Sequence, residues 1–429
     1  MPHVRIIPQK KLSSEQFSDY HSLSPEDFQG LQALLPALSG KRVLHINTTA
    51  QGGGVAEILQ SSVPLENALG IESSWCVLEH SLSFFTATKK IHNGLQGAAV
   101  ILTPDEQETY FGVGSVLKRE FEEVLRSLRP DIVVFHDPQP LPLIFLACRF
   151  AATILRLHID LSTPQNETLE LLKPFIGQAA EVIVSSDDYR TSLQEYSAKH
   201  IAVIPPAIDP LTKKNGVLDT AIAKKILVDH AIDLSVPFIT QISRFDTWKD
   251  PLGALEAYRL AKSSVPGLQL VLAGFVEATD DPEAAEWIDK VTKAGNADPN
   301  IFIFSDLSQL RHLPDDAHFI NALNTLTSCA LQMSRREGFG LTITEAMWKE
   351  RVVVACPSRG ARLQITHEKN GYLASTPAAV ADYVVRTLTD PETAQAMGKA
   401  ARSSVTQNFL LPRYLRLNCQ VYRDVLTNR

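Results

Sequence analysis

The 429-residue chain lacks the sequence features that mark membrane-spanning, secreted and nucleic-acid-binding proteins. Its longest apolar stretches, such as residues 141–148, fall well short of the roughly 20 residues that span a bilayer. Its first residues lack the apolar core of a signal peptide. The net charge is −7 and the acids are scattered, so nothing draws the chain to nucleic acid or to an anionic membrane. We therefore expect a cytoplasmic protein with neither a membrane nor a nucleic-acid partner.

Cysteine is also scarce, and no two cysteines form a C-x-x-C pair. Each one lies in or beside an apolar run, which favours buried free thiols over disulfides or a zinc site. We expect no metal site. The five cysteines are Cys76, Cys148, Cys329, Cys356 and Cys419.

The composition, with 45% hydrophobic and 21% charged residues, is that of a globular protein, and the length allows two or three domains. Short apolar runs alternate with longer helical patterns. Because these runs are continuous, they predict parallel strands buried on both faces and hence an α/β fold. The predicted strands are residues 42–46, 73–78, 132–135, 152–158, 181–185, 201–204, 238–242, 268–273, 301–304, 329–333 and 352–356.

Helical patterns fill the intervals between the predicted strands. The alternation of strands and helices is interrupted once, between Pro205 and Pro237. Prolines there stop a strand, so we place a hinge in this segment. The predicted domains are residues 1–207 and 208–411, both doubly wound and Rossmann-like, with a helix over 412–429 whose docking stays open. Ligands of such folds bind beyond the carboxyl ends of the strands, which predicts a site in a cleft between the domains. The predicted helices include residues 55–69, 115–128, 169–178, 252–264, 282–294, 342–349, 377–388 and 391–407.

A glycine-rich turn, Gln51-Gly52-Gly53-Gly54, follows the first predicted strand. Its glycines let backbone N–H groups approach a ligand, and the helix start favours an anion. The turn lacks the third glycine of a nicotinamide-binding motif and the Gly-Lys-Ser/Thr of a Walker motif. A tight turn without a ligand is the alternative.

A second turn, Glu337-Gly338-Phe339-Gly340, follows the strand at 329–333 and opens a helix. Its free N–H groups are predicted to hold a phosphate. Glu345, about one turn into the helix, suits a vicinal diol such as a ribose, and Glu337 suits another part of the same ligand. Two acids that only cap the helix are the alternative.

Two cations, Arg244 and Lys249, follow the first strand of the second half and suit a diphosphate leaving group. Surface ion pairs with Asp246 or Asp250 are the alternative. The combination of phosphate donors and a diol-binding acid favours a nucleotide-activated sugar over a nicotinamide or ATP.

Polar residues also close two buried strands of the first half, where they are costly unless used or well paired. His158 could donate to a hydroxyl or phosphate. A polyhydroxyl acceptor could be bound by Asp137, Gln139 and Arg156. The alternative is a structural histidine with polar groups at helix starts.

The spacing of Glu337 and Glu345 matches the E-x7-E motif of retaining glycosyltransferases with the GT-B architecture, and Arg244 with Lys249 resembles the donor-phosphate pair of that family. Four segments resemble the trehalose glycosyltransferring synthases, which join a nucleoside-diphosphate glucose to free glucose. These segments are residues 45–59, 156–162, 205–211 and 337–349. The resemblance implies a GT-B fold, two Rossmann-like domains facing across a cleft.

The resemblance also implies roles for individual residues. The catalytic residues would be His158, Glu337, Arg244 and Lys249. The donor-binding residues would be Gly53, Gly54, Arg244, Lys249, Glu337, Phe339, Gly340, Leu341 and Glu345. The acceptor-binding residues would be Asp137, Gln139, Arg156 and His158. In this family the departing phosphate oxygen takes the proton of the attacking hydroxyl, so no metal or added cofactor is implied.

Three positions depart from the family pattern. Arg359 precedes Gly360 where a glycine is usual, and His367-Glu368 replaces Asp-Gly. Leu155 stands where a tryptophan is expected. These departures point to a change in donor or acceptor choice.

We expect a retaining enzyme that makes trehalose from UDP- or ADP-glucose and glucose, with small-molecule sugars as its partners. Transfer to another small acceptor such as glycerate, a trehalose phosphorylase in which Arg359 holds free phosphate, and a non-catalytic sugar-nucleotide sensor are the alternatives. The nucleobase, the physiological direction and the oligomeric state, a homodimer included, stay open.

Overall fold

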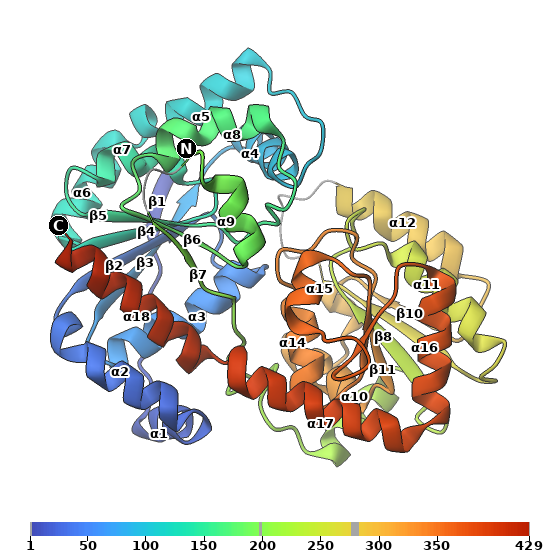
Figure 1. Cartoon of the computed structure of the whole chain (residues 1–429). Helices are drawn as coiled ribbons and strands as arrows, with labels where there is room; N and C mark the ends of the chain where they lie inside the picture. Colours follow the sequence, from blue (N-terminus) through green and yellow to red (C-terminus); the bar gives the residue numbers. More distant parts are fainter. Residues whose placement is uncertain (1, 197–199, 276–282, 429) are drawn as a thin grey trace. The chain divides into compact units, whose positions relative to one another are not determined.

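The computed structural model describes residues 2–196, 200–275 and 283–428, which divide into two compact units (Figure 1). Unit 1 comprises Met1–Ala207 with Leu411–Arg429, and unit 2 comprises Ile208–Leu410. The chain passes from unit 1 to unit 2 inside the proline-rich segment in which we placed the hinge. Leu411, which the sequence put at the end of the second domain, instead begins the last helix of unit 1.

A seven-stranded sheet in the order β1-β3-β2-β4-β5-β6-β7 forms the centre of unit 1. Its strand pairs are parallel except at one edge, where β1 (His3–Ile6) runs antiparallel to β3. The six strands predicted for this half are present, with ends that differ by one or two residues, and β1 was not predicted. They are β2 (Arg42–Asn47), β3 (Glu72–Glu79), β4 (Ile132–His136), β5 (Ala152–Arg156), β6 (Glu181–Val184) and β7 (Ile201–Val203).

The helix predicted over residues 115–128 is present, although it begins at Lys118 and not at Ser115. A separate helix that was not predicted precedes it and begins at Pro104, where Thr103 and Glu106 form a capping box. The helices of unit 1 are α1 (Ser14–Leu23), α2 (Pro25–Leu38), α3 (Gly54–Ala68), α4 (Leu82–Leu95), α5 (Pro104–Val116), α6 (Lys118–Leu128), α7 (Ile144–Ala147), α8 (Asn166–Ile176), α9 (Asp187–Leu193) and α18 (Leu411–Thr427).

The two faces of this sheet differ in chemistry, since side chains alternate between the faces along each strand. One face carries the large apolar cluster that includes Leu44, Phe135 and Leu155, which packs against α4, α5, α6 and α8. The other face carries His45 on β2 and His136 on β4. It is covered by α3, and α18 packs along α2 and contacts α3 (Figure 1).

Unit 2 contains a six-stranded parallel sheet in the order β10-β9-β8-β11-β12-β13. The five strands predicted for this half are present and β13 was not predicted. The strands are β8 (Phe238–Ile242), β9 (Gln269–Ala273), β10 (Ile301–Phe304), β11 (Cys329–Gln332), β12 (Val353–Ala355) and β13 (Tyr372–Leu373). Because both units are parallel sheets with helices packed on them, the α/β prediction is confirmed.

Two apolar clusters lie against the sheet of unit 2. One joins the sheet to α11 and α16, and the other joins it to α10 and α13. The predicted helix over 282–294 begins at a residue outside the described ones. The helices are α10 (Thr220–Asp229), α11 (Pro251–Lys262), α12 (Glu283–Gly295), α13 (Ala317–Leu326), α14 (Leu341–Trp348), α15 (Arg359–Gln364), α16 (Pro377–Thr389) and α17 (Pro391–Asn408).

The cysteines are free thiols, as predicted, although Cys148 and Cys356 are only half-buried while the other three are buried. None of the helices in the described part of the chain combines the length and hydropathy that a bilayer crossing requires.

Candidate active site

The glycine turn between β11 and α14 is held by contacts beneath it. Gly340, at the N-cap of α14, has a φ of 86°, a left-handed conformation that glycine adopts without strain. The Gln364 side-chain amide donates to the carbonyl oxygens of Phe339 (2.6 Å) and Gly340 (3.2 Å). Gly360 lies so close that a Cβ atom there would collide with the Phe339 backbone. The turn is therefore held in one conformation before any ligand binds.

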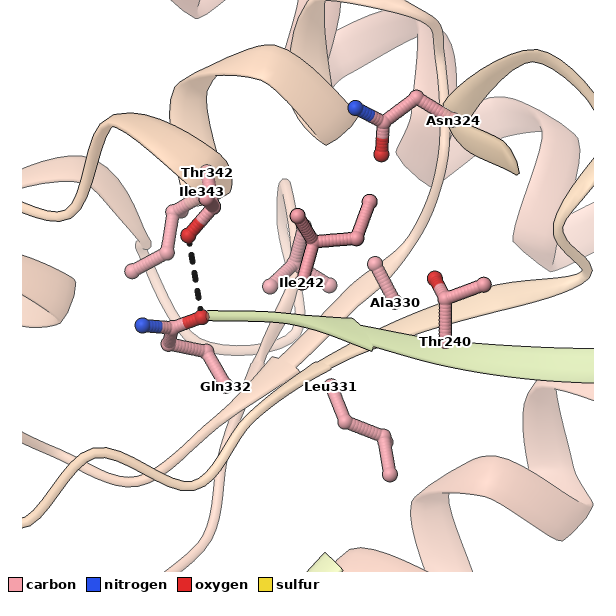
Figure 2. Close-up of a pocket in the computed structure, with 9 residues that line it drawn as sticks. Thr240, Ile242, Asn324, Ala330, Leu331, Gln332, Thr342 and Ile343 are labelled. Carbon is pink, nitrogen blue, oxygen red and sulfur yellow. Dashed lines mark hydrogen bonds between the residues drawn. The ribbon is translucent and has the colours of Figure 1, made fainter. Parts of the chain in front are cut away.

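The Glu337 carboxylate is the centre of this turn. Its Oε2 accepts hydrogen bonds from Lys249 Nζ, with which it forms an ion pair, and from Gln332 Nε2 (3.1 Å) and Ser334 Oγ (3.3 Å). The side-chain oxygen of Gln332 in turn accepts from Thr342 Oγ1 at 3.1 Å, as the dashed line in Figure 2 shows. Groups from β11, its turn and α14 thus orient one carboxylate beside one cation.

The loop that carries Arg244 and Lys249 is organised by the buried Asp246. Its Oδ1 accepts from the backbone N–H groups of Trp248 and Lys249, both at 2.9 Å. Its Oδ2 lies 3.2 Å from Arg244 Nη2, so the ion pair that the sequence left as an alternative is present. The Arg244 side chain is 55% exposed, which leaves it accessible to an anion.

Glu345 lies on α14 one turn after the glycines, as predicted, but it is fully enclosed. Its Oε1 lies 2.7 Å from Nζ of Lys214, a residue that the sequence analysis missed. The segment around Lys214 is fastened to α13 and α14, since Asn321 donates to the Lys213 oxygen at 2.7 Å and Trp348 donates to the Asn215 oxygen at 3.1 Å. Lys214 therefore neutralises the charge of this buried carboxylate.

A cavity of about 10 Å³ lies below the turn, between β8, β11 and α14 (Figure 2). Thr240, Ile242, Asn324 and Gln332 are among the residues that line it. This space corresponds to roughly one water molecule. The cavity is therefore part of the packing beneath the turn and is too small for a sugar.

In unit 1, three histidines form a continuous chain across β2, β4 and the end of β5. Nδ1 of His45 lies 3.0 Å from Nε2 of His136, and Nδ1 of His136 lies 3.0 Å from Nε2 of His158. Nε2 of His45 lies 3.1 Å from the buried Glu66 carboxylate on α3. Burial holds the pKa values of His136 and His158 well below the ordinary value of 6.5, with a smaller contribution from the positive charge of Arg156. Both rings are therefore neutral at pH 7.

Asp137 lies beside His158 at the start of the loop after β4. Its φ is 63°, and its Oδ1 accepts from the backbone N–H of His158 at 2.7 Å. Burial raises the pKa of Asp137 to about 7, although this hydrogen bond and Arg156 oppose the shift. Gln139, two residues on, is half-buried. The predicted pair of Asp137 and His158 is thus brought together.

Comparisons with known proteins identify the family of the chain. Residues 45–191 match the family described as trehalose synthase, N-terminal domain, and residues 223–404 match glycosyl transferases group 1. The chain is 39% identical to the trehalose synthase of Rubrobacter xylanophilus over 418 residues, which cover 95% of this chain and 97% of the relative. It is 36% identical to the trehalose synthase of Pyrococcus horikoshii over 423 residues, which cover 98% of each chain. The chain belongs to the trehalose synthase family.

Solved structures place this trehalose synthase family member among GT-B proteins. The α,α-trehalose-phosphate synthase (UDP-forming) of Burkholderia vietnamiensis matches with a TM-score of 0.69 and 14% identity, over 90% of this chain and 98% of that one. A likeness at this identity concerns the fold. Together with the family match, it confirms the predicted GT-B glycosyltransferase with two Rossmann-like units.

One residue that the resemblance to this family assigned to the acceptor, Arg156, is enclosed within unit 1. Its side chain is 1% exposed. It donates to the Ile204 oxygen at 3.0 Å, and its guanidinium lies over the Tyr414 ring of α18 at 4.7 Å. The side chain thus joins β5 to α18 and the end of β7, and the acceptor contact stays a prediction.

The departures from the family pattern also have structural positions. Leu155 is fully buried in the apolar cluster of unit 1. Arg359 is exposed at the first position of α15, next to the closely packed Gly360. His367 and Glu368 are exposed on the connection that follows α15.

The structure brings the predicted residues into separate groups. Lys249 and Glu337 meet at the turn of Phe339 and Gly340 before Leu341, and Arg244 lies on the same loop as Lys249 in unit 2. Asp137 and His158 meet in unit 1, where Gly53 and Gly54 stand exposed at the start of α3. The supporting residues Gln332, Gln364 and Glu66 were missed, because a lone buried amide or acid inside an apolar pattern carries no spacing signal.

Proposed function

We propose that this family member transfers glucose from UDP- or ADP-glucose to free glucose with retention of configuration, forming trehalose. The observation that supports this most is the Glu337 carboxylate, which Lys249, Gln332 and Ser334 hold at the start of α14. A carboxylate and a cation fixed at a helix N-terminus suit a ligand that presents sugar hydroxyls and a phosphate together.

In this proposal unit 2 binds the donor. Lys249 leaves Glu337 to pair with the diphosphate, Arg244 adds a second positive charge, and Glu337 then accepts hydrogen bonds from hydroxyls of the transferred sugar. The N–H groups at the start of α14 add their partial positive charge. These fixed charges stabilise the leaving group as negative charge develops on it. The two cations carry this role without a metal or an added cofactor.

Unit 1 binds the acceptor through Asp137, Gln139 and His158. The acceptor hydroxyl attacks the anomeric carbon on the face from which the diphosphate departs. A phosphate oxygen takes the hydroxyl proton as the carbon–oxygen bond to the leaving group breaks. Asp137, with its raised pKa, is suited to donate or accept a hydrogen bond with a sugar hydroxyl near neutral pH.

The test is incubation of the purified protein with UDP-glucose or ADP-glucose and free glucose, followed by NMR of the anomeric protons. A single α-anomeric signal of a symmetric disaccharide is expected. Release of nucleotide only with another acceptor, such as glycerate, would keep the donor site and overturn the acceptor. Breakdown of trehalose that needs inorganic phosphate but no nucleotide would favour a phosphorylase. Binding of the donor without turnover would favour a sensor.

A further inference from the structure

The histidine chain of unit 1 has a direction, set by its buried end. Glu66 accepts there from Ser73 Oγ (2.5 Å) and Tyr422 OH (3.3 Å), as well as from His45. A carboxylate has acceptors only, so His45 must donate to it through Nε2–H. Tyr422 comes from α18, so the last helix of the chain completes this end.

The position of each proton along the chain follows from this end. When His45 carries one proton, that proton lies on Nε2, and its Nδ1 then accepts from Nε2–H of His136. His136 then accepts at Nδ1 from Nε2–H of His158. The order needs one proton on each ring, which agrees with the neutral state of His136 and His158. The remaining nitrogen, Nδ1 of His158, is left with a lone pair.

The last ring of the chain is the one positioned to meet a substrate. His45 and His136 are buried, whereas His158 is half-buried. The strand register puts these rings on one face of the sheet. His45 pairs with Val134, two residues before His136, and His136 pairs with Arg156, two residues before His158. Residues two apart on a strand point to the same face. Buried polar groups are normally hydrogen-bonded, and here the rings satisfy one another.

We propose that Glu66, His45 and His136 are positioning residues that fix the tautomer of His158, so that its Nδ1 accepts a hydrogen bond from a sugar hydroxyl. This inference deepens the proposed function, because it rests on His158 contacting the sugars. It also reverses the expectation from the sequence, in which His158 would donate. A hydroxyl that donates to Nδ1 is held with its oxygen lone pairs turned away from the ring.

The first measurement is the tautomer of His158 in the wild-type protein. The full chain is labelled with ¹⁵N-histidine, long-range ¹H–¹⁵N spectra are recorded without substrate, and the His158 signals are assigned by their loss in His158→Gln. We expect a protonated Nε2 and an unprotonated Nδ1. A protonated Nδ1 would overturn the proposal, whatever the variants do.

The second measurement removes the buried end of the chain. The Glu66→Leu substitution takes away the acceptor that holds the His45 proton on Nε2, so the direction of the chain is lost and His158 becomes a mixture of tautomers. We expect kcat for glucosyl transfer to fall about 10- to 100-fold, the range found when partners that orient a histidine are lost. A changed tautomer with unchanged kcat would contradict a positioning role.

Two further variants serve as a control and as a safeguard. Glu181→Gln breaks another carboxylate–histidine pair of unit 1, with His200 at 2.7 Å, and should change neither the His158 tautomer nor kcat. If Glu66→Leu does not fold, His136→Leu interrupts the chain at its middle ring and should likewise leave His158 as a mixture of tautomers. A single unchanged tautomer in His136→Leu would count against the proposal. If the wild-type protein transfers no glucose, the proposed function fails while the spectra still test the tautomer.

Discussion

The strand ends of the two units hold their polar groups in different ways. In unit 2, charges of opposite sign are paired, as in Lys249 with Glu337 and Lys214 with Glu345. In unit 1, neutral imidazole rings form a chain that ends on one carboxylate. An ion pair can release a cation to a phosphate, whereas a neutral hydrogen-bonded chain sets the direction of a single donor or acceptor. The first arrangement suits an anionic donor and the second suits hydroxyl groups.

The glycine turns of the two units differ as well. The turn before α3 is exposed at Gly53 and Gly54, and its side-chain hydrogen bonds lie ahead of the glycines, where Asn47 donates to the Thr49 oxygen at 2.7 Å and Gln60 donates to the Ala50 oxygen at 2.9 Å. The turn before α14 is held by Gln364 and by the backbone of Gly360. Similar local patterns thus produce one adaptable turn and one rigid turn, because the surrounding chain packs under only one of them.

The largest expected effect comes from removing a charge of unit 2. Lys249→Ala and Glu337→Ala should each lower kcat by about 10²-fold or more, the scale seen when one electrostatic contact to a transition state is lost. Because the two side chains form one pair, the double variant should lose less than the product of the single losses. Steady-state kinetics with UDP- or ADP-glucose measure this.

The matched control is another ion pair of unit 2. Lys290 and Glu286 on α12 lie 2.6 Å apart and are exposed, so Lys290→Ala should leave kcat within about a factor of two, as for most surface changes. Near-normal turnover in both Lys249→Ala and Glu337→Ala would instead remove the assigned site.

A smaller effect should follow from loosening the rigid turn. In Gly360→Ala the new Cβ meets the Phe339 backbone, which has to move, so the free energy of unfolding should fall by about 1–3 kcal/mol. Gly112→Ala on α5 is the control, since its Cβ would have no atom within 4 Å and alanine is favoured in a helix. Thermal unfolding distinguishes them: only Gly360→Ala should lower Tm, and equal shifts would refute the close packing under the turn.

The smallest effect concerns the acid of unit 1. The pKa of Asp137 is about 7 when folded, against an ordinary 3.8, so folding favours its protonated form. The stability from this group is present at acidic pH and is lost as the pH rises through 7. Asp137→Asn keeps the acceptor oxygen and does not titrate, so it should gain about 2 °C or more in Tm over wild type between pH 5 and pH 8. A Tm difference that does not change with pH would contradict the raised pKa.

Much of the fold was predictable because buried parallel strands leave continuous apolar runs, and eleven of these were found. The strand β1 was missed, since its segment His3–Ile6 is short, mostly exposed and antiparallel at an edge, so it lacks such a run. The break between α5 and α6 was missed because their apolar patterns continue across Leu117. Local sequence patterns do not show which other helix or strand an element packs against.

The amino-acid pattern alone predicts the α/β class, the change of domain near residue 208 and the charged turn of Glu337 with its cations, because strand burial, proline and glycine act locally. Which polar residues are buried in the interior depends on elements that lie far apart along the chain. Arg156 and His158 are two residues apart on one strand end, yet Arg156 is enclosed by Tyr414 and Ile204 while His158 ends a chain that begins at Glu66. Their separation depends on α18, which comes back to unit 1 from the far end of the chain.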